Sequence, residues 1–195
     1  MRLFVAIDLD DGIRERITRF LEGVRGFAPE ARWVRAESLH VTLKFIGERD
    51  DDDFEKIKTA LATVKAAAFD LNFRGYGYFP SPRAARVFWI GVEADGKLSS
   101  LSTAIDQSLL HVGVLKEEHE FNAHLTLARS GAASRAARKD KKKSTRRMFQ
   151  LLQEKLAGLP APEFGTMTAA EFLLYRSQLS PGGSKYTKLA RFALQ

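Results

Sequence analysis

The feature that most constrains this chain is a four-residue pattern, His-x-Thr-Leu, that occurs twice. His40-Val-Thr-Leu43 and His124-Leu-Thr-Leu127 place their histidines 84 positions apart. The same offset relates Arg2-Leu3-Phe4 to Arg86-Val87-Phe88, and Ile17 and Leu21 to Leu101 and Ile105. A common offset across a strand, a helix and a His-x-Thr strand predicts a duplicated unit, in which each copy contributes one histidine to a shared place.

Apolar patterning predicts the elements around the two motifs. Strands are expected at 2–8, 40–46, 71–78, 85–92, 123–128, 168–175 and 185–194, with a short extended segment around Trp33-Val34. Two helices are expected to begin at Asp10 or Asp11 and at the acidic cluster Asp50–Asp53. A third is expected to include Leu98 through Val112. A fourth is expected to be capped by Ser144 or Thr145 and to continue through Met148, Leu151, Leu152 and Leu156. Residues 130–143 are expected to form a loop.

This order of strands and helices predicts an α+β fold of two pseudo-symmetric lobes. Each lobe is expected to be a mostly antiparallel sheet backed by helices, with a central cleft between them. We expect residues 1–195 to form a single bilobal domain that arose by internal duplication. The first motif unit would span about 1–48 and the second about 85–130, and the lobes could exchange strands.

Composition limits the compartments that suit this chain. Its 195 residues contain no cysteine, which excludes disulfides and favours the cytoplasm. The N-terminal run Met1–Asp8 lacks the length and cleavage site of a signal peptide. No apolar stretch approaches the ~20 residues that span a bilayer, so we expect no membrane association.

The positive charge is concentrated in one segment. The chain has 31 basic and 24 acidic residues, and 135–147 holds eight of the basic ones and one acidic one, which leaves 23 of each elsewhere. Such a cluster favours a nearby polyanion such as RNA. A solvated loop with no partner is an equally good interpretation of this charge run.

Strand alternation predicts which motif residues point together. His40, Thr42 and Lys44 should share one face of their strand, and His124 and Thr126 one face of theirs, while the intervening aliphatic residues face a core. A polar face on an otherwise apolar strand needs solvent, a partner or a ligand. Two such faces, one from each lobe, could line a single cleft.

Two histidines and two hydroxyls suit phosphodiester chemistry. A neutral imidazole can take a proton from water while an imidazolium gives one to the leaving oxygen, and threonine hydroxyls can donate to the phosphate oxygens. A metal site is the competing use of two histidines, but it normally needs a third ligand. The motif faces carry no carboxylate, and His111 and His119 do not repeat, so no metal or other cofactor is expected.

At these residues the chain resembles the two-histidine (2H) phosphoesterase superfamily, and within it the RNA 2′,3′-cyclic phosphodiesterases, also called 2′-5′ RNA ligase-like proteins. The similarity runs nearly end to end. It is carried by Arg2-Leu-Phe-Val-Ala-Ile-Asp8, Leu39-His-Val-Thr-Leu-Lys-Phe-Ile-Gly-Glu48, Phe79-Pro-Ser-Pro82, His124-Leu-Thr-Leu-Ala-Arg129 and Leu174-Tyr-Arg-Ser177 through Tyr186. The run 135–147 is more basic than the family pattern.

The resemblance implies hydrolysis of a terminal 2′,3′-cyclic phosphate to a 2′-phosphate without a metal. Carried onto this chain, His40 would be the proton donor to the leaving 3′ oxygen and His124 the proton acceptor from water. The motifs themselves are near twins and do not order the two roles. Thr42 and Thr126 would hold the phosphate.

Several further residues are weaker candidates for substrate binding. Arg129 follows the second motif in the family pattern, although strict alternation puts it on the wrong face unless the strand end twists. Lys44 shares the predicted His40 face. Phe45, Tyr76 and Tyr186 could stack on a base, or could equally serve as packing.

Two other functions remain open at this point. One is RNA end joining through a 2′-5′ linkage in the same fold, and the other is a non-catalytic RNA-binding module built on the basic run. The expected partner in each case is RNA or an oligonucleotide, with a 2′,3′-cyclic phosphate end for the enzyme. We expect the protein to act as a monomer.

Overall fold

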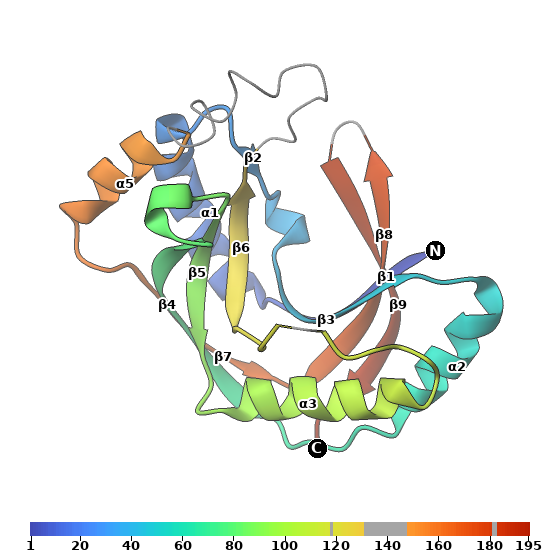
Figure 1. Ribbon diagram of the computed structural model, residues 1–195. Helices are drawn as coiled ribbons and strands as arrows, with labels where there is room; N and C mark the ends of the chain where they lie inside the picture. Colours follow the sequence, from blue (N-terminus) through green and yellow to red (C-terminus); the bar gives the residue numbers. More distant parts are fainter. Residues whose placement is uncertain (118, 131–147, 181–182) are drawn as a thin grey trace.

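Antiparallel strands form one continuous curved sheet in the computed structural model, which describes residues 1–117, 119–130, 148–180 and 183–195 (Figure 1). In this described part the sheet has nine strands. They are β1 (Arg2–Asp8), β2 (Arg32–Trp33), β3 (His40–Glu48), β4 (Phe69–Phe79), β5 (Val87–Glu93), β6 (His124–Arg129), β7 (Glu163–Ala169), β8 (Glu171–Ser180) and β9 (Gly183–Ala193). The predicted α+β class with antiparallel pairing is confirmed.

The strand order divides the sheet into two similar halves. It runs β7-β4-β5-β6-β3-β1-β8-β9, with β2 paired to β6 off this path. The halves meet where β3 and β6 pair through Val41 and Leu125. The half built around β3 takes its outer strands, β8 and β9, from the other end of the chain, beside β1 (Figure 1). The two His-x-Thr strands are therefore central neighbours.

Helices lie against the sheet, and the first two of them begin at capping aspartates. They are α1 (Asp11–Val24), α2 (Asp51–Ala62), α3 (Lys97–Leu110) and α5 (Gln150–Ala157), with 3₁₀ turns at Arg25–Phe27, Ala36–Ser38 and Pro82–Ala84. Asp10 caps α1 by accepting from the Ile13 amide, and Asp50 caps α2 in the same way from Asp53. Both predicted helix starts are confirmed. α1 packs against β7 and α3 against β3, which buries their apolar stripes.

The predicted strand 168–175 is wrong because one strand ends and the next begins within that range. β7 ends at Ala169 and β8 begins at Glu171. β7 was missed because Phe164 and Met167 are both buried although three positions apart. Gly165 between them has φ of 100° beside a register shift in the β4 pairing, so the two-residue period that identifies a strand is lost.

Helix ends also differ from the prediction. The last described helix begins at Gln150, so Met148 precedes it, and Leu151 is exposed rather than inward. The predicted caps Ser144 and Thr145, and the basic run 135–147, lie outside the described residues. No helix in the described part of the chain is long and apolar enough to cross a membrane.

The first strand of the repeat is one residue out of the predicted register. Asp8 pairs with His40, whereas Gly91 pairs with His124, so β1 and β5 correspond at an offset of 83. The predicted match of Phe4 with Phe88 therefore joins opposite faces. Phe4 packs on the histidine side of the sheet, and Phe88 lies in the core beneath the helices.

Candidate active site

The two His-x-Thr motifs lie side by side on β3 and β6. Val41 and Leu125 pair directly and are fully buried. Continuing this antiparallel register by one residue in each direction sets His40 across from Thr126 and Thr42 across from His124. The predicted alternation is confirmed here, because both aliphatic residues face the core and the half-buried polar ones face the other way.

A β-bulge follows the motif in each copy. In β3, Thr42 pairs with Ala6 and Lys44 with Val5, so Leu43 is the extra residue. In β6, Thr126 pairs with Trp89 and Ala128 with Phe88, so Leu127 is the extra residue. Each bulge reverses the alternation of the residues after it.

Backbone groups at and beside these bulges have partners in other elements. The Leu43 carbonyl accepts the Ser102 hydroxyl of α3 at 3.0 Å, and the Phe45 amide donates to Glu117 at 3.1 Å. The Leu127 carbonyl accepts the amide of Val34, just after β2, at 2.8 Å. Specific contacts thus satisfy the backbone at both bulges.

The prediction that Lys44 shares the His40 face is wrong, because the first bulge turns it inward. Its side chain is 2% exposed and forms an ion pair with Asp106 of α3, with the Nζ to Oδ1 distance at 2.7 Å. It also donates to the Leu115 carbonyl at 2.8 Å. Lys44 therefore ties β3 to α3 and the segment after it, and it does not face a substrate.

The same geometry turns Phe45 and Arg129 toward the histidine face. These two residues occupy equivalent places, five positions after His40 and His124. Phe45 is 50% exposed, and the Arg129 guanidinium lies 3.5 Å from the Thr126 hydroxyl, to which it donates. Arg129 could reach this face only if the strand departed from strict alternation, and the bulge at Leu127 provides that departure.

Both histidines are oriented by the same backbone contact. Nδ1 of His40 lies 2.7 Å from the Ser38 carbonyl, and Nδ1 of His124 lies 2.7 Å from the Asn122 carbonyl. A carbonyl oxygen only accepts, so Nδ1 carries the proton in each ring. Nε2 is left as the reactive nitrogen, able to accept a proton or, in the charged ring, to donate one.

Burial keeps both rings neutral in the free protein. It lowers the pKa of His40 to about 4, although the hydrogen bond to Ser38 and the Asp8 carboxylate oppose this shift. Burial also lowers the pKa of His124, with a smaller contribution in the same direction from Arg129. An anion that binds beside the rings would raise both pKa values, because opposite charge favours the protonated form.

Aromatic rings enclose each histidine. The Phe4 and Tyr186 ring centroids lie 4.9 and 5.1 Å from the His40 ring. Phe79 lies 4.9 Å from the His124 ring in an edge arrangement. These contacts, together with the carbonyl anchors, hold both imidazoles in place.

A cleft of about 480 Å³ opens on this face. It is lined by Arg2, Leu3, Phe4, Arg32, Trp33, Val34, Arg35, Ser38, His40, Thr42, Phe45, Thr126, Arg129, Ser177, Leu179, Ser184 and Tyr186. His124 flanks this lining, on the strand face that it shares with Thr126. The cleft thus brings together His40, both threonines and Arg129. Of the predicted stacking residues, Tyr76 lies elsewhere, packed against Tyr78 and Phe88.

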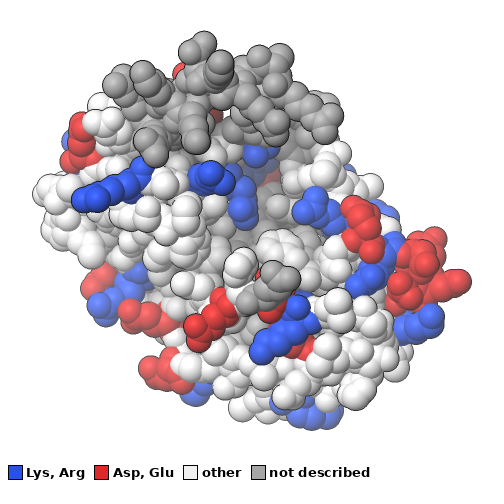
Figure 2. Space-filling view, in the orientation of Figure 1, with Lys and Arg blue, Asp and Glu red and all other residues white. Residues whose placement is uncertain are grey.

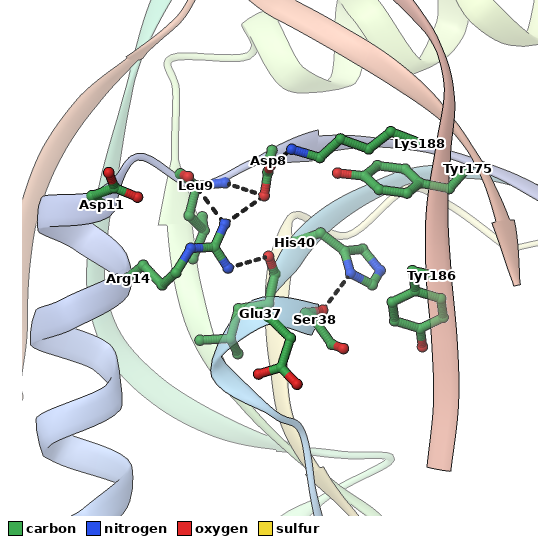
Figure 3. Close-up of a pocket in the computed structure, with 11 residues that line it drawn as sticks. Asp8, Leu9, Asp11, Arg14, Glu37, Ser38, His40, Tyr175, Tyr186 and Lys188 are labelled. Atoms are coloured by element: carbon green, nitrogen blue, oxygen red, sulfur yellow. Dashed lines mark hydrogen bonds and ion pairs between the residues drawn. The ribbon is translucent and has the colours of Figure 1, made fainter. Parts of the chain in front are cut away.

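A second cavity, of about 380 Å³, lies on the other side of His40 (Figure 3). Asp8 lines this cavity and forms ion pairs with Arg14, at 2.6 Å, and with Lys188. Burial alone would raise the pKa of Asp8, but the hydrogen bonds from Lys188 and Arg14 hold it below its ordinary value. Sequence reasoning missed this cluster, because its members come from β1, α1 and β9, and no local pattern joins them.

The second copy has no equivalent carboxylate across from its histidine. Gly91 occupies that position, and a Cβ there would lie 2.7 Å from the Arg74 carbonyl oxygen. In the described residues no group of three or more histidine and carboxylate side chains is placed to hold a metal ion. The two histidines thus share a backbone frame but differ in their charged surroundings.

Comparison with known proteins places this site in context. Residues 7–89 match the family model described as LigT-like phosphoesterase. A protein of Archaeoglobus fulgidus named RNA 2′,3′-cyclic phosphodiesterase is 33% identical, covering 98% of this chain and 99% of its own. An Escherichia coli protein of the same name is 30% identical over 99% of this chain and 96% of its own.

Solved structures agree with the sequence matches. The structure of Escherichia coli LigT complexed with 3′-AMP superimposes with a TM-score of 0.76 at 28% identity, covering 99% of this chain and 97% of that one. TT0787 of Thermus thermophilus superimposes with a TM-score of 0.77 at 27% identity, covering 100% and 98%. With these relatives matched over nearly their whole length, the chain belongs to the LigT-like phosphoesterase family.

Proposed function

We propose that this protein hydrolyses 2′,3′-cyclic phosphate ends of RNA or nucleotides to 2′-phosphates. The observation that carries the proposal is the pair of His-x-Thr strands, adjacent at the centre of the sheet, each with its histidine Nδ1 tied to a carbonyl two residues earlier. Relatives matched over their full length are named for this activity, which supports the same reaction here.

In the proposed reaction, His124 accepts a proton from water through Nε2 as the water oxygen attacks phosphorus. The bond between phosphorus and the 3′ oxygen breaks, and His40 donates its proton to that oxygen. The product carries a 2′-phosphate and a free 3′ hydroxyl. Each turnover leaves the two rings with exchanged protonation, and proton exchange with solvent restores them.

The charge of the substrate supplies the protonation state that the acid requires. His40 is neutral in the free protein because burial lowers its pKa. The anionic cyclic phosphate raises that pKa when it binds, and Asp8 acts in the same direction. Thr42 and Thr126 would donate hydrogen bonds to the phosphate oxygens, where charge builds during attack.

Product analysis tests this proposal. The protein is incubated with a nucleoside 2′,3′-cyclic phosphate in the presence of EDTA, and the products are separated by chromatography. Exclusive formation of the nucleoside 2′-phosphate is expected. A 3′-phosphate product would mean that the 2′ oxygen, and not the 3′ oxygen, is the leaving group. Absence of turnover would favour a module that only binds RNA.

The same site chemistry joins RNA ends through a 2′-5′ linkage when a 5′-hydroxyl replaces water as the nucleophile and the 3′ oxygen again leaves. Offering a cyclic-phosphate end together with a 5′-hydroxyl end separates the two outcomes, because a joined 2′-5′ product appears only if the protein is also a ligase. We further propose that the chain acts as a monomer in the cytoplasm, as one bilobal domain of duplicated origin. Light scattering after size exclusion checks the monomer.

A further inference from the structure

Two arginines lie directly opposite each other at the rim of the cleft. Arg32 of β2 and Arg129 of β6 form a cross-strand pair in the antiparallel ladder. Like charges in this position repel and destabilise the pairing. Partial desolvation and the neighbouring Arg32 lower the pKa of Arg129, although Tyr186 opposes this shift. The free protein thus carries unfavourable positive charge at this point.

Nothing acidic compensates that charge among the residues that the structure describes. Neither Arg32 nor Arg129 has an ion pair there, and the described lining of the cleft contains four arginines and no carboxylate. Arg32 donates only a long 3.4 Å hydrogen bond to the Ser130 carbonyl. Figure 2 shows basic side chains gathered around the hollow of this face. Such a site is suited to an anion.

The arginine pair extends from the second motif toward the outer strand β2. The backbone of Arg129 lies three residues beyond Thr126 on β6, at most roughly 10 Å because the bulge at Leu127 shortens the strand. Its guanidinium reaches back to Thr126, while Arg32 lies one strand further out. An anion between the two arginines is therefore a neighbour of the cyclic phosphate, as the preceding phosphodiester of an RNA strand is.

We propose that Arg32 and Arg129 together hold the phosphodiester one nucleotide upstream of the terminal cyclic phosphate, so that an RNA strand end is preferred over a free cyclic mononucleotide. This inference rests on the proposed function. Bound phosphate relieves the repulsion between the two guanidinium groups, and each can donate paired hydrogen bonds to it.

The test compares three substrates with one terminal nucleoside. They are uridine 2′,3′-cyclic phosphate, the dinucleotide UpU with a 2′,3′-cyclic phosphate end, and the same dinucleotide with a neutral methylphosphonate linkage. The charged dinucleotide is expected to have a kcat/KM about tenfold or more above the neutral one, the scale of a charge-assisted hydrogen bond. Arg32→Gln should abolish that ratio and leave the mononucleotide rate within about twofold.

Salt dependence and stability separate binding from a structural role. Arg32→Gln should reduce the salt slope of kcat/KM for the charged dinucleotide by about 0.7, as loss of one phosphate contact on a single strand does. It should not lower Tm in the absence of ligand, because it removes repulsion. Arg25→Gln, an exposed arginine outside the cleft, is the matched control.

The outcomes distinguish this inference from the proposed function. If the parent hydrolyses all three substrates with equal kcat/KM, or if Arg32→Gln lowers all three equally, the upstream phosphate site does not exist while the hydrolase remains. If the parent hydrolyses none, the proposed function itself fails.

Discussion

Each motif histidine has one ring nitrogen committed to the backbone and one left for chemistry. The Nδ1 contact to the carbonyl two residues earlier is the same in both copies, at 2.7 Å. It sets the tautomer without any second side chain. What differs is the neighbourhood, with Asp8 across from His40 and Gly91 across from His124.

Alanine at either motif histidine should remove most turnover. We expect His40→Ala and His124→Ala each to lower kcat by about 10²–10⁴-fold, the usual contribution of an acid or base. Both side chains leave the strand away from the main core, so circular dichroism and Tm should change little. His119→Ala, which alters an exposed histidine, is the control. Near-parental hydrolysis of a cyclic phosphate by either variant would contradict the two-histidine mechanism.

Valine at either motif threonine keeps the shape but removes a hydroxyl donor. Thr42→Val or Thr126→Val should cost roughly 2–4 kcal/mol of transition-state stabilisation if the hydroxyl acts on developing charge. The loss should appear in kcat, measured in steady state against Thr166→Val on the exposed face of β7. A change confined to KM would mean that the threonines hold only the ground state.

At the scale of elements, the paired β-bulges after the motifs decide what faces the cleft. They turn Phe45 and Arg129 toward it and send Lys44 and Ala128 inward. Ser102 and Val34 donate to the carbonyls of the two bulged residues, Leu43 and Leu127. A strand without the bulge would present Lys44 beside His40, as simple alternation predicts.

Removing Lys44 should damage stability rather than catalysis. Lys44→Met leaves Asp106 without its buried partner, which typically costs about 3–5 kcal/mol in free energy of unfolding. Urea denaturation should show this loss, and Lys44→Met combined with Asp106→Leu should recover most of it. The kcat of the folded variant should stay close to that of the parent. A stable but inactive Lys44→Met protein would place this lysine in the cleft after all.

At the scale of the whole molecule, the burial of the two motif histidines is linked to the stability of the fold. The two halves of the sheet pair at β3 and β6, and the histidine on each of these two strands is buried. The unfolded chain exposes both rings, whose ordinary pKa is about 6.5. Protonation therefore favours the unfolded chain.

The free energy of unfolding should consequently fall as the medium is acidified. Between pH 6.5 and about 4 the unfolded chain binds protons that folded His40 does not, because burial lowers the folded pKa to about 4. Asp8, whose folded pKa is lowered, adds a further loss below its ordinary range. Urea denaturation at pH 7, 6 and 5 measures the slope. The double variant His40→Gln, His124→Gln should have a shallower slope, and an equal slope would disprove the linkage.

Local pattern alone determined much of this protein. The doubled His-x-Thr strands, the caps at Asp10 and Asp50 and the inward stripe of α1 depend on residues close in sequence, so periodicity and capping chemistry predict them. The motif faces around Val41 and Leu125 follow from the same rule. The repeat of the pattern was visible too, though the strands β1 and β5 correspond at an offset of 83 rather than the predicted 84.

Tertiary structure decided the rest, because strand pairing joins residues that are distant in the chain. The bulge that buries Lys44 exists only against β1 and α3, and the break at Ala170 only against the strands beside it. Asp8 meets His40, and Arg32 meets Arg129, through hydrogen-bond registers that no local pattern records. A one-residue change of register reverses every face, so the sequence determined which side chains could do the chemistry and the assembled sheet determined which of them meet.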